Sequence, residues 1–339
     1  MRKWQLKSGS ATPLTVEETP SREPGPGAAR IRVRAASLNF RDLLARRGTY
    51  PMAGDHPVVP LSDGAGDVVA VGAGVTRVAA GDRVTATTIT NWIDGAFDPA
   101  SAAQSIGFSV DGWLADEIVL PETALVKLPN AMSYESAATL ACAGVTAWNA
   151  IVETARIGPG QHVLALGTGG VSMFAVQLGK LVGARVLVTS GSDDKIARAR
   201  ALGADDGVNY RSHPEWHAVV RTLTGGNGVD LVVETVGDIE RSAQATRWNG
   251  LVAVIGLLSH SGREARASAD GSGRWPQRNA RVAPILMGNR RMLTRLVKAY
   301  ALNGVTPVID GTFTFDEAPD AFAALAAAQH VGKLVINGE

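Results

Sequence analysis

The spacing of apolar residues divides the chain into two parts with different secondary-structure patterns. In the first part, up to about residue 125, short apolar segments are separated by glycine-containing turns. Arg30–Ala35 alternates strictly between polar and apolar residues, and Gly64–Val71 and Asp82–Thr87 are further candidates for strands. This part of the chain is therefore predicted to be a β-rich domain.

From about residue 143 the pattern becomes an apolar strand, a turn and a helix, repeated. The predicted strands are 162–166, 184–189, 230–234 and 251–255, and the predicted helices are 171–181, 193–202 and 239–247. Continuous apolar strands that alternate with helices are typical of a parallel sheet covered on both faces. We therefore predict an α/β domain whose strand series closes at Ile255, followed by a loop over residues 260–281.

The last 50 residues do not continue this alternation cleanly. They predict a helix at 290–302, a strand at 311–315, an alanine-rich helix at 318–329 and a short strand at 333–336.

Length and composition narrow the function classes. A chain of 339 residues has room for two domains, and a formal charge of +1 provides no overall field for nucleic acid or an anionic membrane. No apolar run reaches the ~18 residues of a membrane span, and the first residues lack the apolar core of a signal peptide. The single cysteine, Cys142, can form neither an internal disulfide nor a four-thiolate zinc site. We expect a cytoplasmic protein that binds neither nucleic acid nor membranes.

A glycine-rich turn follows the predicted strand at 162–166. Such a turn lets the backbone approach a pyrophosphate, and the helix after it offers free N–H groups and a positive dipole end. The third glycine of the usual pattern is replaced by Ser172, which is also small. A purely structural turn is the alternative, but the strand before it and the helix after it favour a dinucleotide site at Gly167, Thr168, Gly169, Gly170 and Val171.

The end of the next strand predicts which dinucleotide binds. NAD sites favour an acidic residue there to accept a hydrogen bond from the ribose 2′-hydroxyl, whereas this chain has Ser190, followed by Ser192 and Lys195. Two hydroxyls and an ammonium suit the 2′-phosphate of NADPH. Alternatively, Ser192 is an N-cap and Lys195 a solvated helix residue, and an N-cap serine can also face a phosphate.

Several segments together resemble a known family. They are EPGPGAARIRVRAASLNFRDLLARRGTYP, PLSDGAGDVVAVGAGVTRVAAGDRV, LACAGVTAWNAI, GPGQHVLALGTGGVSMFAVQLGK, ALGADDGVNYR and the terminal HVGKLVING. They are similar to the zinc-independent, quinone-oxidoreductase-like branch of the medium-chain dehydrogenase/reductase superfamily. The resemblance implies a GroES-like catalytic domain, residues 1–142 and 289–339, and a Rossmann NADP-binding domain, residues 143–288.

The same resemblance locates the positions where related alcohol dehydrogenases bind catalytic zinc. Their cysteine ligand corresponds to Asn39, and the His and Glu of their GHE motif correspond to Ser62 and Asp63. Only Cys142 matches a ligand, and a lone thiol cannot hold a zinc that needs three protein ligands. We therefore expect no metal, and interpret Cys142 as a small buried residue.

Without a metal, hydrogen bonds must polarise the substrate, and a side chain or water must supply any proton. Asn39, at the position of the zinc-ligand cysteine, is expected to face the nicotinamide and the substrate. Tyr50 resembles a tyrosine that some enoyl-thioester reductases of the superfamily use near the reacting alkene. Its alternative role is packing ahead of Pro51.

Further cofactor contacts follow from the resemblance alone. Thr146, Gly256 and Leu257 are expected along the nicotinamide, Thr235 and Val236 near the adenine and ribose, and Tyr210 beside the 2′-phosphate. Lys333 is expected to contact a phosphate or the nicotinamide side. A homodimer is expected by analogy.

The function implied is NADPH-dependent hydride transfer to a conjugated enone, an enoyl compound or a quinone. Two alternatives stay open: a zinc-free alcohol or carbonyl oxidoreductase, and an NADPH-binding sensor or structural protein. The substrate is expected to be a small molecule, hydrophobic or an acyl thioester. Residues 260–295 carry a net charge of +6, which favours either a solvated loop or recognition of an anionic substrate handle such as phosphopantetheine.

Overall fold

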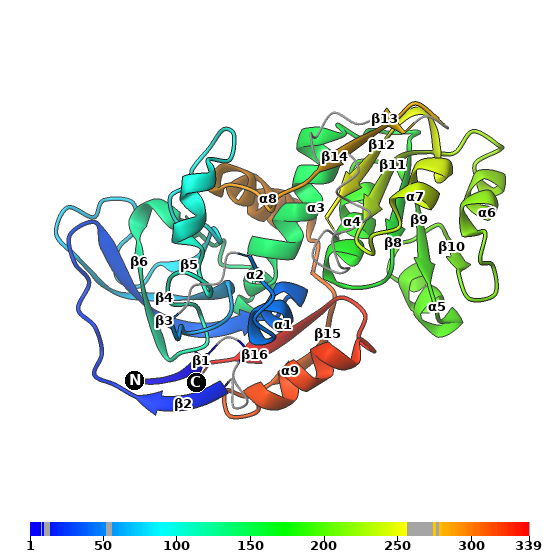
Figure 1. Cartoon of the computed structure of the whole chain (residues 1–339). Coiled ribbons are helices and arrows are strands. Elements are labelled where there is room, and N and C mark those ends of the chain that lie inside the picture. Colours follow the sequence, from blue (N-terminus) through cyan, green and yellow to red (C-terminus); the bar gives the residue numbers. More distant parts are fainter. Residues whose placement is uncertain (8, 10–13, 52–55, 256–273, 276–277, 339) are drawn as a thin grey trace. The chain divides into compact units, whose positions relative to one another are not determined.

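A computed structural model describes residues 1–7, 9, 14–51, 56–255, 274–275 and 278–338 (Figure 1). The chain forms two compact units, Met1–Val145 with Met287–Glu339, and Thr146–Leu286. These boundaries lie within three residues of those expected from the sequence. The first unit joins both ends of the chain, which explains why the tail departs from the strand–helix alternation.

The first unit is built on a sheet with the strand order β15-β16-β3-β4-β5-β7, and β6 also pairs with β3. A separate antiparallel pair contains β1 and β2. The strands are β1 (Arg2–Leu6), β2 (Leu14–Glu18), β3 (Ala28–Ser37), β4 (Asp63–Val71), β5 (Arg83–Ala86), β6 (Glu117–Pro121), β7 (Leu125–Lys127), β15 (Ile309–Phe313) and β16 (Lys333–Asn337).

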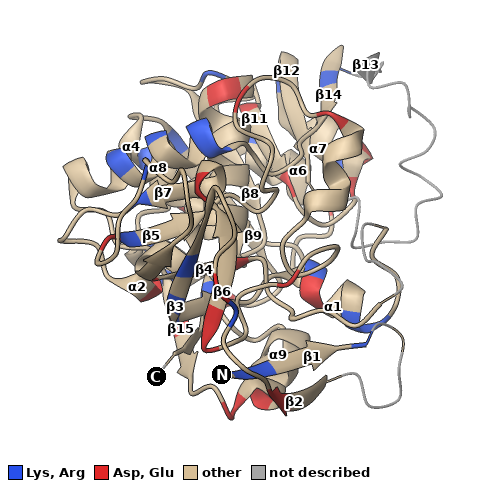
Figure 2. Cartoon of the chain, turned by 90° about the vertical axis from the view of Figure 1, so that its left-hand side faces the viewer, with Lys and Arg blue, Asp and Glu red and all other residues tan. Residues whose placement is uncertain are grey.

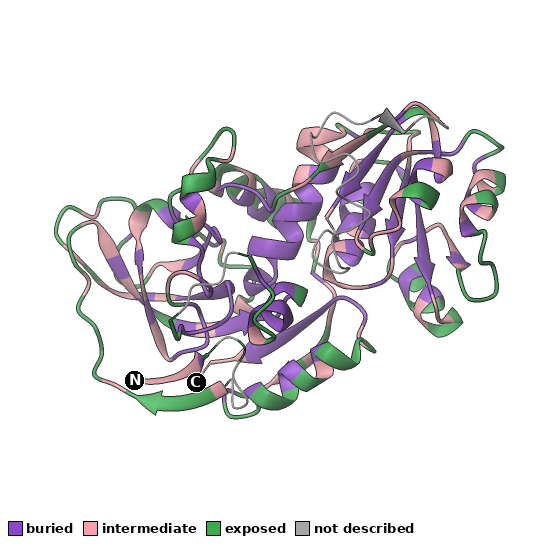
Figure 3. Cartoon of the chain, viewed as in Figure 1, coloured by how far each residue is buried: buried purple, intermediate pink, exposed green. Residues whose placement is uncertain are grey.

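The strand β3 shows how the sequence pattern positions the core. Ala29, Ile31 and Val33 point inward and are at most 3% exposed, whereas the arginines between them are more exposed. They belong to one apolar cluster with Trp113 and Phe322. Figure 3 colours the strands of this unit by burial. The alternation in the sequence therefore marks a strand with one buried face.

Short helices surround this sheet. They are α1 (Phe40–Arg46), η1 (Pro99–Gln104), η2 (Glu122–Ala124), α2 (Tyr134–Ala138), η3 (Leu140–Gly144), α8 (Arg290–Asn303) and α9 (Ala318–Ala327), and α3 (Val145–Trp148) spans the boundary between the units. The longest of them, α8, carries four basic residues and no acidic residue, so the end of the basic 260–295 segment is helical (Figure 2). Arg290 donates to the Thr123 carbonyl oxygen and Arg291 pairs with Asp94.

The second unit is a doubly wound sheet with the strand order β10-β9-β8-β11-β12-β14-β13, parallel except for β13. The strands are β8 (His162–Leu166), β9 (Arg185–Ser190), β10 (Asp206–Asn209), β11 (Val229–Glu234), β12 (Thr246–Val254), β13 (Arg274–Trp275) and β14 (Ala280–Pro284). The helices are η4 (Asn149–Thr154), α4 (Gly170–Leu181), α5 (Asp193–Ala201), α6 (Trp216–Leu223) and α7 (Ile239–Ala245). The predicted parallel-sheet domain is confirmed.

Three strands of this sheet escaped prediction: β10, β13 and β14. The series does not close at Ile255, because β14 pairs in parallel with β12. Its sequence, ARVAP, contains an arginine and a proline, and only Ala280 is fully buried, so no continuous apolar run marks it. The strand β10 lies at one edge of the sheet, and its sequence, DGVN, has a single buried apolar residue, so no apolar run marks it either. The strand β13 lies at the opposite edge and has only two residues. Most of the predicted 260–281 loop lies outside the described residues.

Within the described part of the chain, no helix combines the length and the apolar character needed to cross a membrane.

Candidate active site

A tight turn connects β8 to α4 in the second unit. Gly167 has φ +77°, which a residue with a side chain rarely adopts, and its N–H donates to the Thr189 hydroxyl at 3.3 Å. Ser172, at the third-glycine position, is buried, and its hydroxyl donates to the Leu166 carbonyl oxygen at 2.6 Å. Serine is suited to this position because it ties the first turn of α4 to the end of β8.

The N-terminus of α4 is open. Gly169 is its N-cap residue, and a Cβ added there would meet no atom within 4 Å. The backbone N–H groups and the positive end of the helix dipole can therefore receive an anionic group. The structure brings the predicted turn residues together at this point, namely Gly167, Thr168, Gly169, Gly170 and Val171.

The end of β9 carries hydroxyls where an NAD site would favour a carboxylate. Ser190 is buried, and its hydroxyl accepts the Ser192 N–H at 3.3 Å. The Ser192 hydroxyl in turn accepts the Lys195 N–H at 3.4 Å, so its predicted N-cap role is confirmed. The carboxylates of Asp193 and Asp194 belong to the first turn of α5.

Two side chains that directly follow β10 border Gly191. A Cβ added to this glycine would lie 2.7 Å from the Tyr210 hydroxyl and 2.9 Å from Arg211 Nε. The pairing of β10 with β9, with Asn209 opposite Ser190, brings both side chains here. The structure therefore places Tyr210 next to the end of β9 and adds Arg211, which the sequence analysis missed although it directly follows Tyr210.

The ends of β8 and β11 are linked at the point where the strand order reverses, which is where doubly wound sheets bind nucleotides. The Thr235 hydroxyl donates to the Leu166 carbonyl oxygen at 2.7 Å. Val236 is 41% exposed, and the buried Glu234 carboxylate accepts its N–H at 2.7 Å. Burial raises the pKa of Glu234, although the N–H groups that it accepts act in the opposite direction.

Of the three predicted nicotinamide contacts, one lies within the described residues. Thr146 is 3% exposed at the start of the second unit. Gly256 and Leu257 lie outside the described residues.

In the first unit, sheet register places Lys333 next to Asn39. Val335 lies opposite Ser37 in the antiparallel β16–β3 pair. Continuing this antiparallel register by two residues brings Lys333 opposite Asn39. On its other side, Ser37 pairs with Asp63 at the start of β4. The sheet thus gathers four polar side chains from distant parts of the sequence, which we call the Lys333 cluster: Ser37, Asn39, Asp63 and Lys333.

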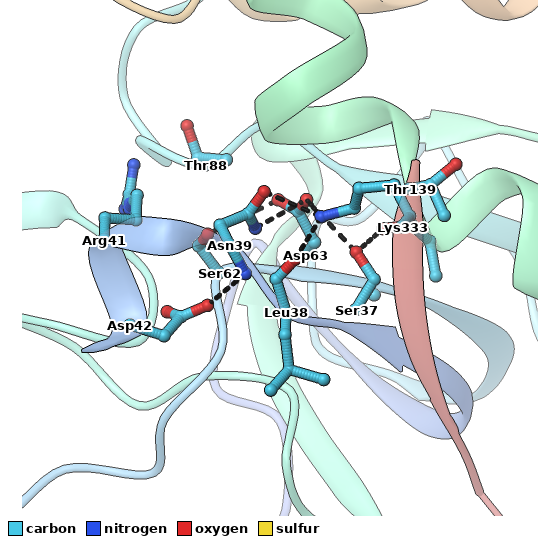
Figure 4. Close-up of polar contacts among 12 residues, drawn as sticks. Ser37, Leu38, Asn39, Arg41, Asp42, Ser62, Asp63, Thr88, Thr139 and Lys333 are labelled. Atoms are coloured by element: carbon cyan, nitrogen blue, oxygen red, sulfur yellow. Dashed lines mark hydrogen bonds and ion pairs between the residues drawn. The ribbon is translucent and has the colours of Figure 1, made fainter. Parts of the chain in front are cut away.

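The Lys333 cluster is connected by hydrogen bonds (Figure 4). Lys333 Nζ donates to Asn39 Oδ1 at 2.7 Å and to the Leu38 carbonyl oxygen, and lies 3.8 Å from Asp63 Oδ2. Asn39 Nδ2 donates to the same Asp63 oxygen at 3.0 Å. Asn39 therefore bridges the ammonium and the carboxylate, and its amide orientation is fixed by both.

The cluster is almost completely buried, with Lys333 3% and Asp63 0% exposed. Burial lowers the pKa of Lys333 and raises that of Asp63, while the attraction between the two groups opposes both shifts. Each charge therefore depends on the other for compensation. The family resemblance places Lys333 at a phosphate or the nicotinamide side, and in the structure its ammonium donates to Asn39 and Leu38.

Two further ionisable groups border this cluster. Asp42 Oδ2 accepts the Asn39 N–H at 2.7 Å, and burial raises the pKa of Asp42 to about 7. The Cys142 thiol is buried, and burial, with Asp63 acting in the same direction, raises its pKa to about 12. Cys142 is therefore protonated at neutral pH.

Tyr50 and Arg41 form an aromatic and cationic contact beside the cluster. The Tyr50 ring lies 4.5 Å from the Phe108 ring, and the Arg41 guanidinium carbon lies 5.4 Å from the centre of the Tyr50 ring. Tyr50 is 7% exposed, and burial raises the pKa of its hydroxyl. Tyr50 therefore both packs in the core and keeps its proton at neutral pH.

Comparisons with known proteins match both units. Residues 25–130 match the family model described as alcohol dehydrogenase GroES-like domain, and residues 170–301 that described as zinc-binding dehydrogenase. A zinc-type alcohol dehydrogenase-like protein of Schizosaccharomyces pombe is 36% identical over 316 residues, which cover 92% of this chain and 91% of that protein. The chain belongs to the medium-chain dehydrogenase/reductase superfamily.

Solved structures of the superfamily share the whole fold. An NAD-dependent alcohol dehydrogenase is 33% identical with a TM-score of 0.87, and all of each chain is covered. A quinone oxidoreductase of Pseudomonas syringae is 29% identical with a TM-score of 0.81, and 99% of each chain is covered. The GroES-like and Rossmann fold class is thereby confirmed, and the chain is an oxidoreductase of a superfamily that uses a nicotinamide cofactor.

The superfamily's zinc-ligand positions, as aligned in the sequence analysis, fall on and around the Lys333 cluster. Asn39 belongs to it, and the Ser62 hydroxyl donates to Asp63 Oδ1 at 3.4 Å. Burial, together with the charge of Asp63, raises the pKa of the Cys142 thiol. Among the residues that the structure describes, no three His, Cys, Asp or Glu side chains are grouped so that they could hold a metal ion. The residue that sequence reasoning did not connect to these positions is Lys333.

Proposed function

We propose that the chain is an NADPH-dependent reductase that acts without zinc on a conjugated carbonyl compound or a quinone. The observation that carries the proposal is the ammonium of Lys333, which is bonded to Asn39 and paired with Asp63 where zinc-type relatives are expected to hold their metal.

The donor chemistry at these positions does not suit zinc. Asn39, Ser62 and Cys142 offer an amide, a hydroxyl and a protonated thiol, and the Asp63 carboxylate is already engaged by Lys333 and Asn39. A divalent cation there would also face the Lys333 ammonium, and two positive charges in a buried site repel each other strongly. We therefore propose that Lys333 supplies the positive charge of this region.

The second unit suits a nicotinamide dinucleotide, which supplies a hydride when bound. The open N-terminus of α4 would receive its pyrophosphate. At the end of β9, Ser190 replaces the usual acid, and Tyr210 and Arg211 border Gly191. Hydroxyl and guanidinium donors without a carboxylate on the strand end favour the 2′-phosphate of NADPH over the bare ribose of NADH.

Tyr50 is proposed to supply a proton to the substrate. Replacing Tyr50 with Phe keeps the ring stacked on Phe108 and removes only the hydroxyl. We expect kcat for enone reduction to fall about 100-fold, the range typical for loss of a general acid, while NADPH affinity is unchanged. The control is Tyr300→Phe, which alters another buried tyrosine of the same unit and is expected to leave kcat unchanged. Unchanged turnover in Tyr50→Phe would reduce this residue to a packing role.

The second candidate function is a zinc-free alcohol or carbonyl oxidoreductase, which is favoured by the relatives named as alcohol dehydrogenases. The two candidates are separated by the loss of NADPH absorbance with three substrates, cyclohexenone, naphthoquinone and hexanal. We expect turnover with the enone or the quinone to exceed that with the aldehyde. Aldehyde turnover alone favours the second candidate, and no turnover with any of the three favours an NADPH-binding protein without catalysis.

A further inference from the structure

Arg41 is a buried cation inside the first unit. It lies in α1 and is 5% exposed. Its guanidinium carbon lies 4.1 Å from the centre of the Phe108 ring and 5.4 Å from that of Tyr50. Contacts with two aromatic rings fix a planar guanidinium and hold it beside the candidate catalytic tyrosine.

The hydrogen bonds of this guanidinium go to neutral groups. An arginine has five N–H donors and stays protonated at any physiological pH. Nη2 donates to the Ser105 hydroxyl at 3.2 Å, Nη1 contacts the Met287 thioether, and Nε has no acceptor among the described residues. A hydroxyl and a thioether are neutral, and a thioether is a weak acceptor.

The neighbouring carboxylate does not act as a contacting counter-ion. Asp42 follows Arg41 in α1, but its Oδ2 accepts the Asn39 N–H at 2.7 Å. Figure 4 shows the two side chains leaving the helix in different directions, that of Asp42 toward Asn39. Within the part of the chain that the structure describes, no carboxylate lies in ion-pair contact with Arg41, although nearby groups, Asp42 and Asp63 among them, raise its pKa against the effect of burial. The N–H of Nε, which has no acceptor among the described residues, and that of Nη1, which meets only a thioether, can therefore donate to a partner that arrives from outside.

We propose that Arg41 binds the carbonyl oxygen of the substrate, and that the substrate class is therefore a conjugated carbonyl compound. This inference rests on the proposed function. When a hydride adds to the β-carbon of an enone, the electron pair of the C=C bond moves toward the carbonyl oxygen, which is negative until a proton reaches the α-carbon. Fixed N–H donors aimed at such an oxygen stabilise the charge as it develops.

Met287 makes this site adaptable. Its sulfur contacts Arg41 Nη1 and accepts from the Thr88 hydroxyl at 3.3 Å. A methionine side chain has three rotatable bonds, so it can turn aside for an oxygen that accepts more strongly from the guanidinium. The Tyr50 ring contacts the same guanidinium, so Tyr50 would then lie next to the bound oxygen and near the α-carbon that receives the proton.

The first test measures anion binding without cofactor or turnover. Benzoate, a planar carboxylate, is titrated into the full-length protein by calorimetry. We expect Arg41→Met to weaken benzoate binding by at least about 10-fold, the effect of losing charge-assisted hydrogen bonds. Arg46→Met is the matched control, because Arg46 lies in the same helix over the Phe322 ring at 5.9 Å, and it should bind benzoate as the wild type does.

Arg41→Lys keeps the charge and serves where Arg41→Met does not fold. It loses the planar fork, so we expect an intermediate loss of benzoate affinity in a protein whose circular dichroism matches that of the wild type. The inference is overturned if the wild type does not bind benzoate, or if both Arg41 variants bind it within about twofold of the wild-type affinity.

The second test separates this inference from the proposed function. For cyclohexenone, Arg41→Met should lower kcat/KM at least about 10-fold with unchanged NADPH affinity. Equal turnover in the variant and the wild type overturns the role of Arg41 and leaves the proposed reductase intact. Arg41-dependent benzoate binding in a wild type that reduces none of the three test substrates overturns the proposed function and leaves Arg41 as an anion-binding residue.

Discussion

Lys333→Met is expected to lower the free energy of unfolding by about 3–5 kcal/mol, the usual effect of removing one partner from a buried ion pair. Methionine has a similar length, so the change removes the ammonium with little loss of volume. Asp63, which is fully buried, then has no contacting cation, and Asn39 Oδ1 loses its donor. Urea unfolding followed by tryptophan fluorescence measures the effect.

The control for this prediction is a second change at the other end of the pair. In Lys333→Met combined with Asp63→Asn, no unpaired charge is left, so we expect most of the lost stability to return. Lys298→Met, on the exposed face of α8, should change stability by no more than about 0.5 kcal/mol. A Lys333→Met protein as stable as the wild type would contradict the charge-compensation role of Lys333.

The double variant Lys195→Ala with Arg211→Ala is expected to lower the ratio of kcat/KM for NADPH to that for NADH by about 100-fold. Each of the two cations is proposed to make a charge-assisted hydrogen bond to the 2′-phosphate, and such bonds contribute about 1.5–3 kcal/mol each. NADH lacks this phosphate, so its kcat/KM should change little. Steady-state kinetics with both cofactors and cyclohexenone provides the ratio.

Arg200→Ala is the matched control for the cofactor experiment. Arg200 lies in the same helix as Lys195, but its guanidinium pairs with Asp206 at 3.8 Å. Its loss should leave the cofactor ratio unchanged. A wild-type protein that prefers NADH, or a double variant with the wild-type ratio, would contradict the assignment of the 2′-phosphate site.

Local sequence patterns were sufficient for most of the Rossmann unit. The strand at His162–Leu166 and the helices at α4 and α5 could be predicted because a buried parallel strand is continuously apolar and its helix begins at a glycine turn or an N-cap. The polar edge strand β10 and the strand β14 could not, because neither buries enough apolar residues to produce a run. Arg211 was missed with β10, since only the pairing of β10 with β9 brings it to Gly191.

The catalytic unit depended more on contacts between distant residues. The sequence and its resemblance singled out Asn39 and Lys333 separately, but the two are 294 positions apart and meet only through the register of β16 against β3. Arg41 gave no signal of its own, because a basic residue in a short helix usually faces solvent. Its burial follows from packing against Phe108 and Tyr50, and no periodicity in the sequence predicts that contact.

We propose that this chain reduces a conjugated carbonyl compound with NADPH and carries the Lys333 ammonium where zinc-type relatives are expected to hold their metal. The most direct measurement is the rate of cyclohexenone reduction by the full-length protein before and after exhaustive dialysis against a chelator, with the zinc content of both samples determined by mass spectrometry. We predict NADPH-dependent turnover at the same rate in both, with no zinc in the dialysed protein. Activity that is lost on dialysis and restored by added zinc would contradict the account.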